Sequence, residues 1–204
     1  MSQPVSVIRT GTANLASVLA ALERAGARPT LTDSADEVSS ADRVVLPGVG
    51  AFGAAMPLLR EHGLDDALVA RVREGRPLLC ICLGMQLLFE GSEESPGVPG
   101  LGLIEGQVTR FQGRGLRVPQ LGWNQLTAGP QCQLLSDGYV YFANSFRVEH
   151  PPHGFHVALS DHGGHFVAAI ERGPLLACQF HPELSGAFGQ VLLRRWLDAG
   201  ERPC

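Results

Sequence analysis

The sequence contains no lysine, since all 16 of its basic residues are arginine. This absence excludes the chemistry that depends on a lysine amine: a Schiff base, a lysine general base and the phosphate-binding lysine of a P-loop. Positive charge is also scarce, with a formal net charge of -4 and no basic run interleaved with aromatic residues. The composition therefore argues against a nucleic-acid-binding protein.

Long hydrophobic runs are also absent. No apolar stretch approaches the roughly 20 residues that a membrane-spanning helix needs, and the opening segment "MSQPVSVIRTGT" has too few apolar residues for a signal peptide. The five cysteines are odd in number and irregularly spaced, which indicates reduced cytosolic thiols rather than a disulfide framework. With 204 residues, 45% hydrophobic and 18% charged, we expect a cytoplasmic enzyme that forms one domain over residues 1–204.

The first half of the chain alternates strand and helix patterns. Apolar runs predict strands at 4–8, 43–50 and 76–82, and helical spacing predicts helices at 13–26, at 57–75 with a break near Gly63, and at 84–91. Such alternation indicates a mostly parallel central sheet flanked by helices in three layers. After Gly91 the patterns predict shorter, added antiparallel strands, a hairpin around residues 160–166 and a closing helix at 185–200. We therefore expect an α/β fold.

The segment "CICLGMQ" (residues 80–86) has the pattern of a strand–turn–helix elbow. Such an elbow lifts the residue at the turn to the edge of the sheet, and that residue is Cys82. Free N–H groups at the start of the following helix would favour the thiolate, which is the reactive form of cysteine. Cys80 lies within the strand and is expected to fill the core.

A nucleophilic cysteine needs a base and an orienting group, and "QFHPEL" supplies both. His181 and Glu183 follow a second apolar run, and residues two apart in an extended segment face the same way. Pro182 favours extended geometry for His181. Ligands bind at the carboxyl ends of parallel strands, and we expect both Cys82 and His181 at such ends.

The third element is the glycine-rich turn "LPGVGAFG" (residues 46–53), which also follows a strand. Glycines allow backbone N–H groups to point into a concavity that can hold an anion. Together with the Leu83 N–H, one N–H of this turn could form an oxyanion hole.

In combination, "PGVG", "CICLGMQ" and "HPE" resemble the class I (triad) glutamine amidotransferases, whose fold is flavodoxin-like. The resemblance covers essentially the whole chain. Within that family "GTANLASVLAALERAG", "GWN" (122–124) and "YFANSF" (141–146) resemble the glutaminase subunit of imidazole glycerol phosphate synthase. The resemblance implies glutamine hydrolysis through a cysteine thioester. It also implies ammonia transfer, in histidine biosynthesis, to a (β/α)8-barrel cyclase subunit as the partner in a heterodimer.

The resemblance further implies roles for individual residues. Cys82 would attack the glutamine side-chain carbonyl, His181 would act as base and acid, and Glu183 would orient the imidazole. The oxyanion would bind the backbone amides of Leu83 and of one residue of the glycine turn, Val49 or Gly50. Residues that would hold the glutamine substrate are Gly50, Gln86, Tyr141, Asn144 and Ser145. Residues that would lie toward the cyclase and the ammonia exit are Asn14, Trp123 and Asn124. No cofactor or metal is implied.

The sequence departs from the usual family pattern at positions outside the triad. Arg9 and Thr10 replace an Asp-Tyr-Gly-like stretch, and Cys80 stands where glycine is usual. Asn144 replaces a common histidine and Leu184 a common lysine. Arg9 and Leu184 bear on contacts with the partner, because those positions resemble interface positions in the family.

Three hypotheses for function remain. Besides the synthase subunit, the chain could serve another synthase, such as pyridoxal phosphate synthase. It could also be a non-catalytic metal-binding protein, because His150, His153, His156, His162 and His165 fall within one short stretch; we expect these instead to be solvated surface residues. For the first hypothesis we predict weak activity alone and strong stimulation by the cyclase with its phosphoribulosyl nucleotide bound.

Overall fold

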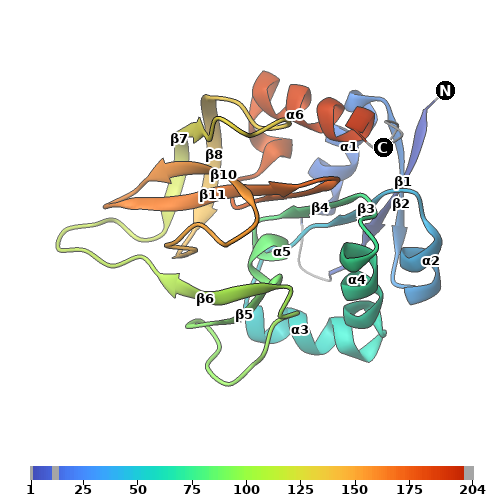
Figure 1. The fold of residues 1–204 in the computed structure, drawn as a ribbon, viewed down its shortest axis with the longest axis horizontal. Helices are drawn as coiled ribbons and strands as arrows, with labels where there is room; N and C mark the ends of the chain where they lie inside the picture. Colours follow the sequence, from blue (N-terminus) through green and yellow to red (C-terminus); the bar gives the residue numbers. More distant parts are fainter. Residues whose placement is uncertain (1, 11–13, 200–204) are drawn as a thin grey trace.

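The computed structural model describes residues 2–10 and 14–199. A nine-stranded sheet with the order β2-β1-β3-β4-β12-β11-β10-β7-β8 runs through the molecule (Figure 1). Its first five strands are parallel: β2 (Ala27–Thr32), β1 (Gln3–Ile8), β3 (Val44–Leu46), β4 (Leu78–Ile81) and β12 (Leu175–Cys178). The other four are antiparallel: β11 (His165–Arg172), β10 (His156–Asp161), β7 (Gln120–Ala128) and β8 (Gly138–Asn144). A small second sheet contains β5 (Phe89–Ser92), β6 (Ile104–Arg110) and β9 (Phe146–Arg147).

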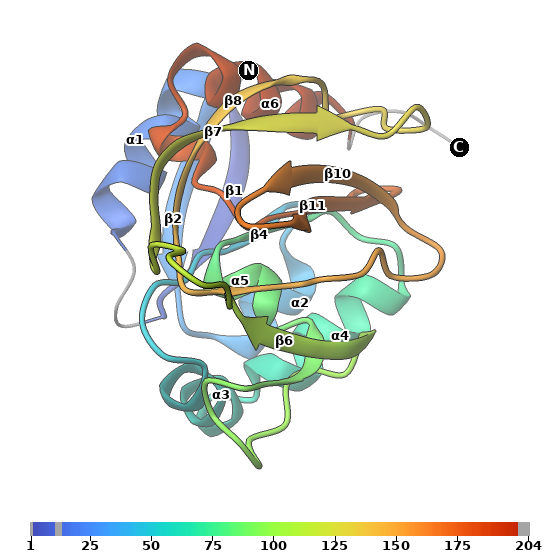
Figure 2. The ribbon, with the colours of Figure 1, turned by 90° about the vertical axis from the view of Figure 1, so that its left-hand side faces the viewer.

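Helices cover both faces of the parallel half (Figures 1 and 2). One face carries α1 (Leu15–Ala25) and α6 (Gly186–Ala199). The other carries α2 (Ala35–Ser40), α3 (Phe52–Glu61), α4 (Leu64–Arg73) and the short α5 (Leu83–Gln86). The arrangement confirms the predicted three-layer α/β fold with added antiparallel strands. Within residues 2–10 and 14–199, no helix has the length and apolar character that a membrane crossing requires.

The central strand β4 is apolar throughout because it is covered on both faces. Leu79 and Ile81 pack into the core on the α1–α6 side, whereas Leu78 and Cys80 pack into the core on the opposite side. Successive side chains of a strand point to opposite faces, so a strand covered on both faces needs an apolar residue at every position. Cys80 is 0% exposed, as expected for core filling.

Several predicted boundaries are confirmed. Helix α1 ends at Gly26, whose φ of 104° is the left-handed conformation of a helix terminator. The predicted helix at 57–75 is broken at Gly63, but its first part begins earlier, at Phe52. Strand β2, helix α2 and strand β7 were not predicted from the pattern.

The predicted helix at 84–91 is wrong beyond Gln86. Helix α5 ends there, and Phe89–Ser92 forms β5, which pairs in parallel with β6. The residues from Leu83 to Phe89 are all buried, so the segment has no polar face whose period could distinguish helix from strand. Pairing with β6, which lies outside the segment, decides the conformation.

Candidate active site

The expected catalytic residues meet at one edge of the sheet because β4 and β12 are adjacent and parallel, with Ile81 paired to Cys178. Cys82 follows β4 directly, and His181 lies three residues beyond β12. Both residues therefore lie at the carboxyl edge of the sheet, where Cys82 immediately precedes α5.

Residues 78–86 form a tight strand–turn–helix elbow. Cys82 has φ 54° and ψ −110° and is, among the described residues, the one non-glycine residue with positive φ. Such strained backbone persists where its surroundings hold it, and here the Cys82 N–H donates to the Cys178 carbonyl at 2.7 Å. A Cβ on Gly84 would lie 2.1 Å from the Leu46 carbonyl oxygen. Glycine is therefore required for the turn to pass this close to β3.

The backbone donors expected at the thiol are largely engaged elsewhere. The Leu83 N–H donates to the Gly48 carbonyl at 3.3 Å, and the N–H groups of Met85 and Gln86 donate to the Cys82 carbonyl. Helix α5 also has only four residues, so its dipole is small. The helix N-terminus therefore contributes less to the thiol than the sequence predicts.

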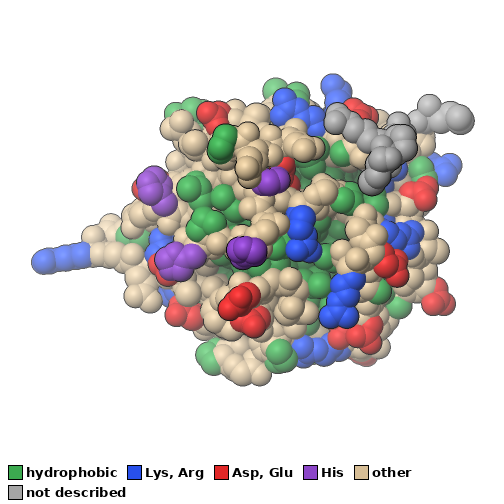
Figure 3. Space-filling model, viewed as in Figure 1, with side chains coloured by type: hydrophobic (Ala, Val, Ile, Leu, Met, Phe, Trp, Pro, Cys, Tyr) green, Lys and Arg blue, Asp and Glu red, His purple; other side chains and the backbone are tan. Residues whose placement is uncertain are grey.

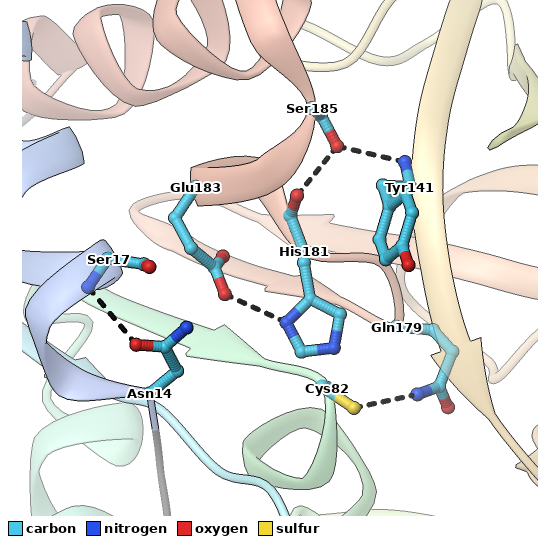
Figure 4. Close-up of polar contacts among 8 residues, drawn as sticks. All are labelled: Asn14, Ser17, Cys82, Tyr141, Gln179, His181, Glu183 and Ser185. Atoms are coloured by element: carbon cyan, nitrogen blue, oxygen red, sulfur yellow. Dashed lines mark hydrogen bonds and ion pairs between the residues drawn. The ribbon is translucent and has the colours of Figure 1, made fainter. Parts of the chain in front are cut away.

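His181 is held between Glu183 and Cys82 (Figure 4). Its Nδ1 lies 2.8 Å from Glu183 Oε1, and because a carboxylate only accepts, Nδ1 carries the proton and Nε2 is left for Cys82. The side chains of His181 and Glu183 are 6% and 4% exposed. Burial lowers the pKa of His181, but hydrogen bonds to Cys82 and Glu183 outweigh it and raise the pKa to about 10.

The contact between His181 and Glu183 forms in a different way from that predicted. Only His181 is extended, with φ −100° and ψ 96°, whereas Pro182–Leu184 is a turn of 3-10 helix. The turn folds the carboxylate of Glu183 back onto the imidazole. Extended geometry was the wrong reason for a contact that the structure does contain.

Ser185, which the sequence analysis missed, fastens this turn to β8. Its hydroxyl donates to the His181 carbonyl at 2.6 Å and accepts from the Tyr141 N–H at 3.0 Å. The His181 N–H in turn donates to the Tyr141 carbonyl at 2.9 Å. Ser185 is 1% exposed, so the backbone of His181 is fixed from both sides by buried hydrogen bonds.

A pocket of about 460 Å³ opens at this edge. It is lined by most of the residues expected from the sequence: Asn14, Val49, Gly50, Cys82, Leu83, Gln86, Tyr141, Asn144, Ser145, His181 and Glu183. Glu94 also lines the pocket and was missed, although the acidic loop "SEES" could have suggested it. Its carboxylate accepts the Phe52 N–H at 2.7 Å, at the start of α3. Leu184 completes the rim and is 40% exposed.

Trp123 and Asn124 lie outside the pocket lining. Neighbouring residues of a strand face opposite sides, and the two side chains accordingly diverge. Trp123 is 57% exposed and meets the Tyr141 ring edge-on, with ring centroids 6.2 Å apart. Asn124 donates instead to the Asp161 carbonyl at the end of β10, at 2.7 Å. Of the two, only Trp123 shares a face with pocket-lining Tyr141.

The histidine stretch does not assemble into a ligand set. His162 contacts the Arg117 carbonyl at 2.8 Å and His165 lies 3.5 Å from an Asp161 carboxylate oxygen. In the described part of the chain, no three His, Cys, Asp or Glu side chains are grouped so that they could hold a metal ion. The histidines on the face in Figure 3 are spread out rather than convergent. The four cysteines within the described ranges are all unpaired thiols, and burial raises the pKa of Cys80 well above its ordinary value.

The family model "Glutamine amidotransferase class-I" matches residues 7–198. Together with the fold and the Cys82–His181–Glu183 geometry, this match defines a class I glutamine amidotransferase. Among curated relatives, the imidazole glycerol phosphate synthase subunit HisH of Thermosynechococcus vestitus is 46% identical, covering 97% of this chain and 98% of the relative. The HisH subunit of Deinococcus radiodurans is also 46% identical, covering 93% and 90%. The chain belongs to the HisH family, the glutaminase subunits of imidazole glycerol phosphate synthase.

A solved structure described as a glutamine amidotransferase shares the fold, with a TM-score of 0.77, 24% identity and coverage of 97% of this chain and 99% of that one. The predicted fold class, family and enzyme class are therefore confirmed. The relatives favour the first of the three functional hypotheses over another synthase or a metal-binding protein.

Proposed function

We propose that the chain hydrolyses L-glutamine to glutamate and ammonia through a thioester on Cys82, and delivers the ammonia to a cyclase subunit of imidazole glycerol phosphate synthase. The observation that carries the proposal is the position of His181, whose Nδ1 lies 2.8 Å from Glu183 Oε1 and whose ring lies beside Cys82 in the same pocket (Figure 4). Base, orienting carboxylate and thiol stand in the order that acyl transfer requires.

Glutamine is a zwitterion with an uncharged amide at its far end, so its pocket needs groups for both charges. The Glu94 carboxylate lines the pocket and is suited to the α-ammonium group. Gln86, Asn144, Ser145 and backbone at Gly50 are the candidates for the carboxylate and the side chain. With these contacts the amide carbon would sit over the Cys82 sulfur.

The chemistry would begin from an ion pair in which the Cys82 thiol proton has already passed to His181 Nε2, as the raised pKa of His181 favours. The thiolate attacks the amide carbon, a carbon–sulfur bond forms, and the carbonyl electron pair moves onto oxygen. When that tetrahedral intermediate collapses, the carbon–nitrogen bond breaks and His181 gives its proton to the departing ammonia. Water, deprotonated by His181, then attacks the thioester, and the proton returns to the sulfur as glutamate leaves. Glu183 stabilises each imidazolium formed on this route.

The tetrahedral intermediate requires an oxyanion hole, for which Leu83 and Val49 or Gly50 are our candidates. The Leu83 N–H donates to the Gly48 carbonyl at 3.3 Å, so that carbonyl occupies a donor that the oxyanion would need. Rotation of the Gly48–Val49 peptide would remove the carbonyl and turn an N–H toward the pocket. One missing donor costs about 10²–10³-fold in rate. We infer that the isolated chain is nearly inactive and that the partner promotes this rotation.

We assign the partner-binding surface to the exposed face of β7 and β8. The side chains of Leu121, Trp123 and Tyr139 are 64%, 57% and 63% exposed, although all three are large and apolar. Tyr141 on the same face lines the pocket, so the surface is continuous with the pocket mouth. We expect the cyclase to cover this face, with Asn14 and Leu184 at the rim near the ammonia exit and Asn124 at the side.

We infer also that the chain acts in the cytoplasm, as one amidotransferase domain over residues 1–204. The domain assignment is supported by a single nine-stranded sheet and by a family match over residues 7–198.

The test is glutamine hydrolysis by the purified chain, alone and with the cyclase subunit from the same organism, each with and without the cyclase's phosphoribulosyl nucleotide. We expect strong stimulation only when cyclase and nucleotide are both present. High activity of the chain alone would still support the triad, but it would contradict the inference that the partner activates the chain. Absence of activity in all four conditions would contradict the proposed partner.

A further inference from the structure

Gln179 is a buried polar residue with no role in the mechanism above. It lies between β12 and His181, is 0% exposed, and its backbone N–H donates to the Ala168 carbonyl at 2.8 Å. Its side chain turns toward the catalytic thiol, with Nε2 3.7 Å from Cys82 Sγ (Figure 4). A fully buried amide that reaches the reacting sulfur calls for a functional explanation.

The hydrogen-bond network fixes which end of the Gln179 amide faces the sulfur. The Phe146 carbonyl can only accept, and Gln86 Nε2 donates to it at 3.4 Å. The same Gln86 nitrogen lies 2.8 Å from the Gln179 amide, which must therefore present its oxygen there. The NH₂ group of Gln179 is consequently the end directed at Cys82.

This donor matters because Cys82 is 7% exposed, so water gives its thiolate little solvation. A buried charge requires hydrogen-bond partners. The His181 imidazole lies beside the sulfur (Figure 4), but the N–H groups of Leu83, Met85 and Gln86 are used in backbone hydrogen bonds. The Gln179 amide approaches the sulfur independently of His181.

We propose that Gln179 is a positioning residue that holds the Cys82 sulfur as an oriented thiolate and links it to Gln86 in the pocket wall. The inference rests on the proposed function, since it assigns Gln179 a part in the same thioester chemistry. When glutamine occupies the pocket and contacts Gln86, the Gln86–Gln179–Cys82 chain of hydrogen bonds keeps the sulfur aimed at the amide carbon. If the Gln179 side chain only filled the core, it would support folding but would not alter the reactivity of the Cys82 thiol.

The experiment is alkylation of Cys82 by iodoacetamide in the full chain over a pH series, followed by mass spectrometry of the labelled peptide. Gln179→Met keeps much of the side-chain shape but removes the amide, and Gln179→Glu replaces the NH₂ group with a carboxyl oxygen. We expect alkylation near neutral pH to slow about tenfold in the first variant, the effect of one hydrogen bond to a charged group. Gln179→Glu should slow alkylation of Cys82 about a hundredfold. In both variants the pH midpoint of alkylation should be displaced upward.

The other ionisable side chains that line the pocket with Cys82 are the same in both variants. They are His181, Glu183, Glu94 and Tyr141. Gln190→Met is the matched control, because it removes a side-chain amide that bonds the Ala21 carbonyl in the α1–α6 contact. It should lower the melting temperature without changing alkylation of Cys82. Cys132, which is partly exposed, reports within each variant whether thiol labelling changes generally.

A measurement on the unsubstituted chain covers the case in which the variants fail to fold. The side-chain amide protons of Gln179, followed by NMR, should shift with the same pH midpoint as alkylation of Cys82. An unchanged alkylation profile in folded variants, or amide signals that do not respond, would overturn the role of Gln179. In that case loss of hydrolysis in Cys82→Ala would still support the triad, whereas retained hydrolysis there would overturn the proposed function itself.

Discussion

The two halves of the nine-stranded sheet differ in cover and in what they contribute. The parallel half has helices on both faces, and its central strands β4 and β12 are fully buried. Cys82 and His181 emerge at its edge. In the antiparallel half, β7 and β8 expose Leu121, Trp123 and Tyr139 to solvent. The helix-covered half positions the reacting groups, and the exposed half carries the apolar surface that we propose for the partner.

Tyr141 on β8 connects the exposed face of the antiparallel half to the catalytic residues. Its backbone bonds His181 and Ser185, and its ring lies against Trp123. A partner that covers Trp123 would therefore touch a strand that also fixes the backbone of the catalytic histidine. A substitution in the parallel half should therefore abolish hydrolysis without weakening partner binding. A substitution on the exposed face of the antiparallel half should weaken partner binding without removing a catalytic group.

Replacing the nucleophile should give the largest effect on the parallel half. Cys82→Ala is expected to lower partner-stimulated glutamine hydrolysis by at least about a thousandfold, because it removes the sulfur on which the proposed thioester forms. Cys80→Ala, two residues earlier on the same strand, is the control and should retain most activity. Substantial hydrolysis by Cys82→Ala would contradict the assignment.

Adding a methyl group at Gly84, in the elbow, should destabilise the fold. In Gly84→Ala the new Cβ would lie 2.1 Å from the Leu46 carbonyl oxygen, which forces β3 and α5 apart. We expect a loss of about 3 kcal/mol in the free energy of unfolding, measured with urea. Gly113→Ala, whose Cβ would meet only the Leu116 side chain at 3.3 Å, should change stability by less than about 0.5 kcal/mol. Equal effects would show that the elbow is not tightly packed.

On the antiparallel half, Trp123→Ala should weaken binding of the cyclase subunit by about 2 kcal/mol, roughly thirtyfold in Kd. Binding can be measured by calorimetry. Val191 on α6 is also an exposed apolar residue, 44% exposed, and Val191→Ala should leave the affinity unchanged. If the two substitutions act alike, the exposed face of β7 and β8 is not the docking surface.

The smallest effect concerns the pH dependence of stability. The pKa of His181 is raised from 6.5 to about 10 in the folded chain, so its contribution to stability is complete below about pH 6.5 and is lost as pH rises toward 10. Glu183→Gln removes one charged partner and should flatten this decline by about 1–2 kcal/mol. Urea unfolding of both chains between pH 6 and 10 measures the difference, and parallel curves would show that Glu183 does not stabilise the imidazolium.

The sequence predicts the parts of the molecule that depend on local pattern. The elbow at Cys82, the terminator Gly26 and the break at Gly63 need only the chain's own period and its glycines. Two features could not be predicted from local pattern. Strand β5 forms because β6 pairs with it, and Glu183 reaches His181 through a 3-10 turn that the motif does not specify. The roles of Ser185 and Gln179 could not be predicted from motifs, because each depends on contact with a residue far away in the sequence, Tyr141 for Ser185 and Cys82 for Gln179.

The most direct test of the account is rapid-quench mass spectrometry of the chain mixed with glutamine in the presence of the cyclase and its nucleotide. A glutamyl thioester on Cys82 that forms and decays within one turnover, with no adduct on Cys80, is the predicted result. Turnover of glutamine without any adduct on Cys82 would contradict the central assignment of the nucleophile.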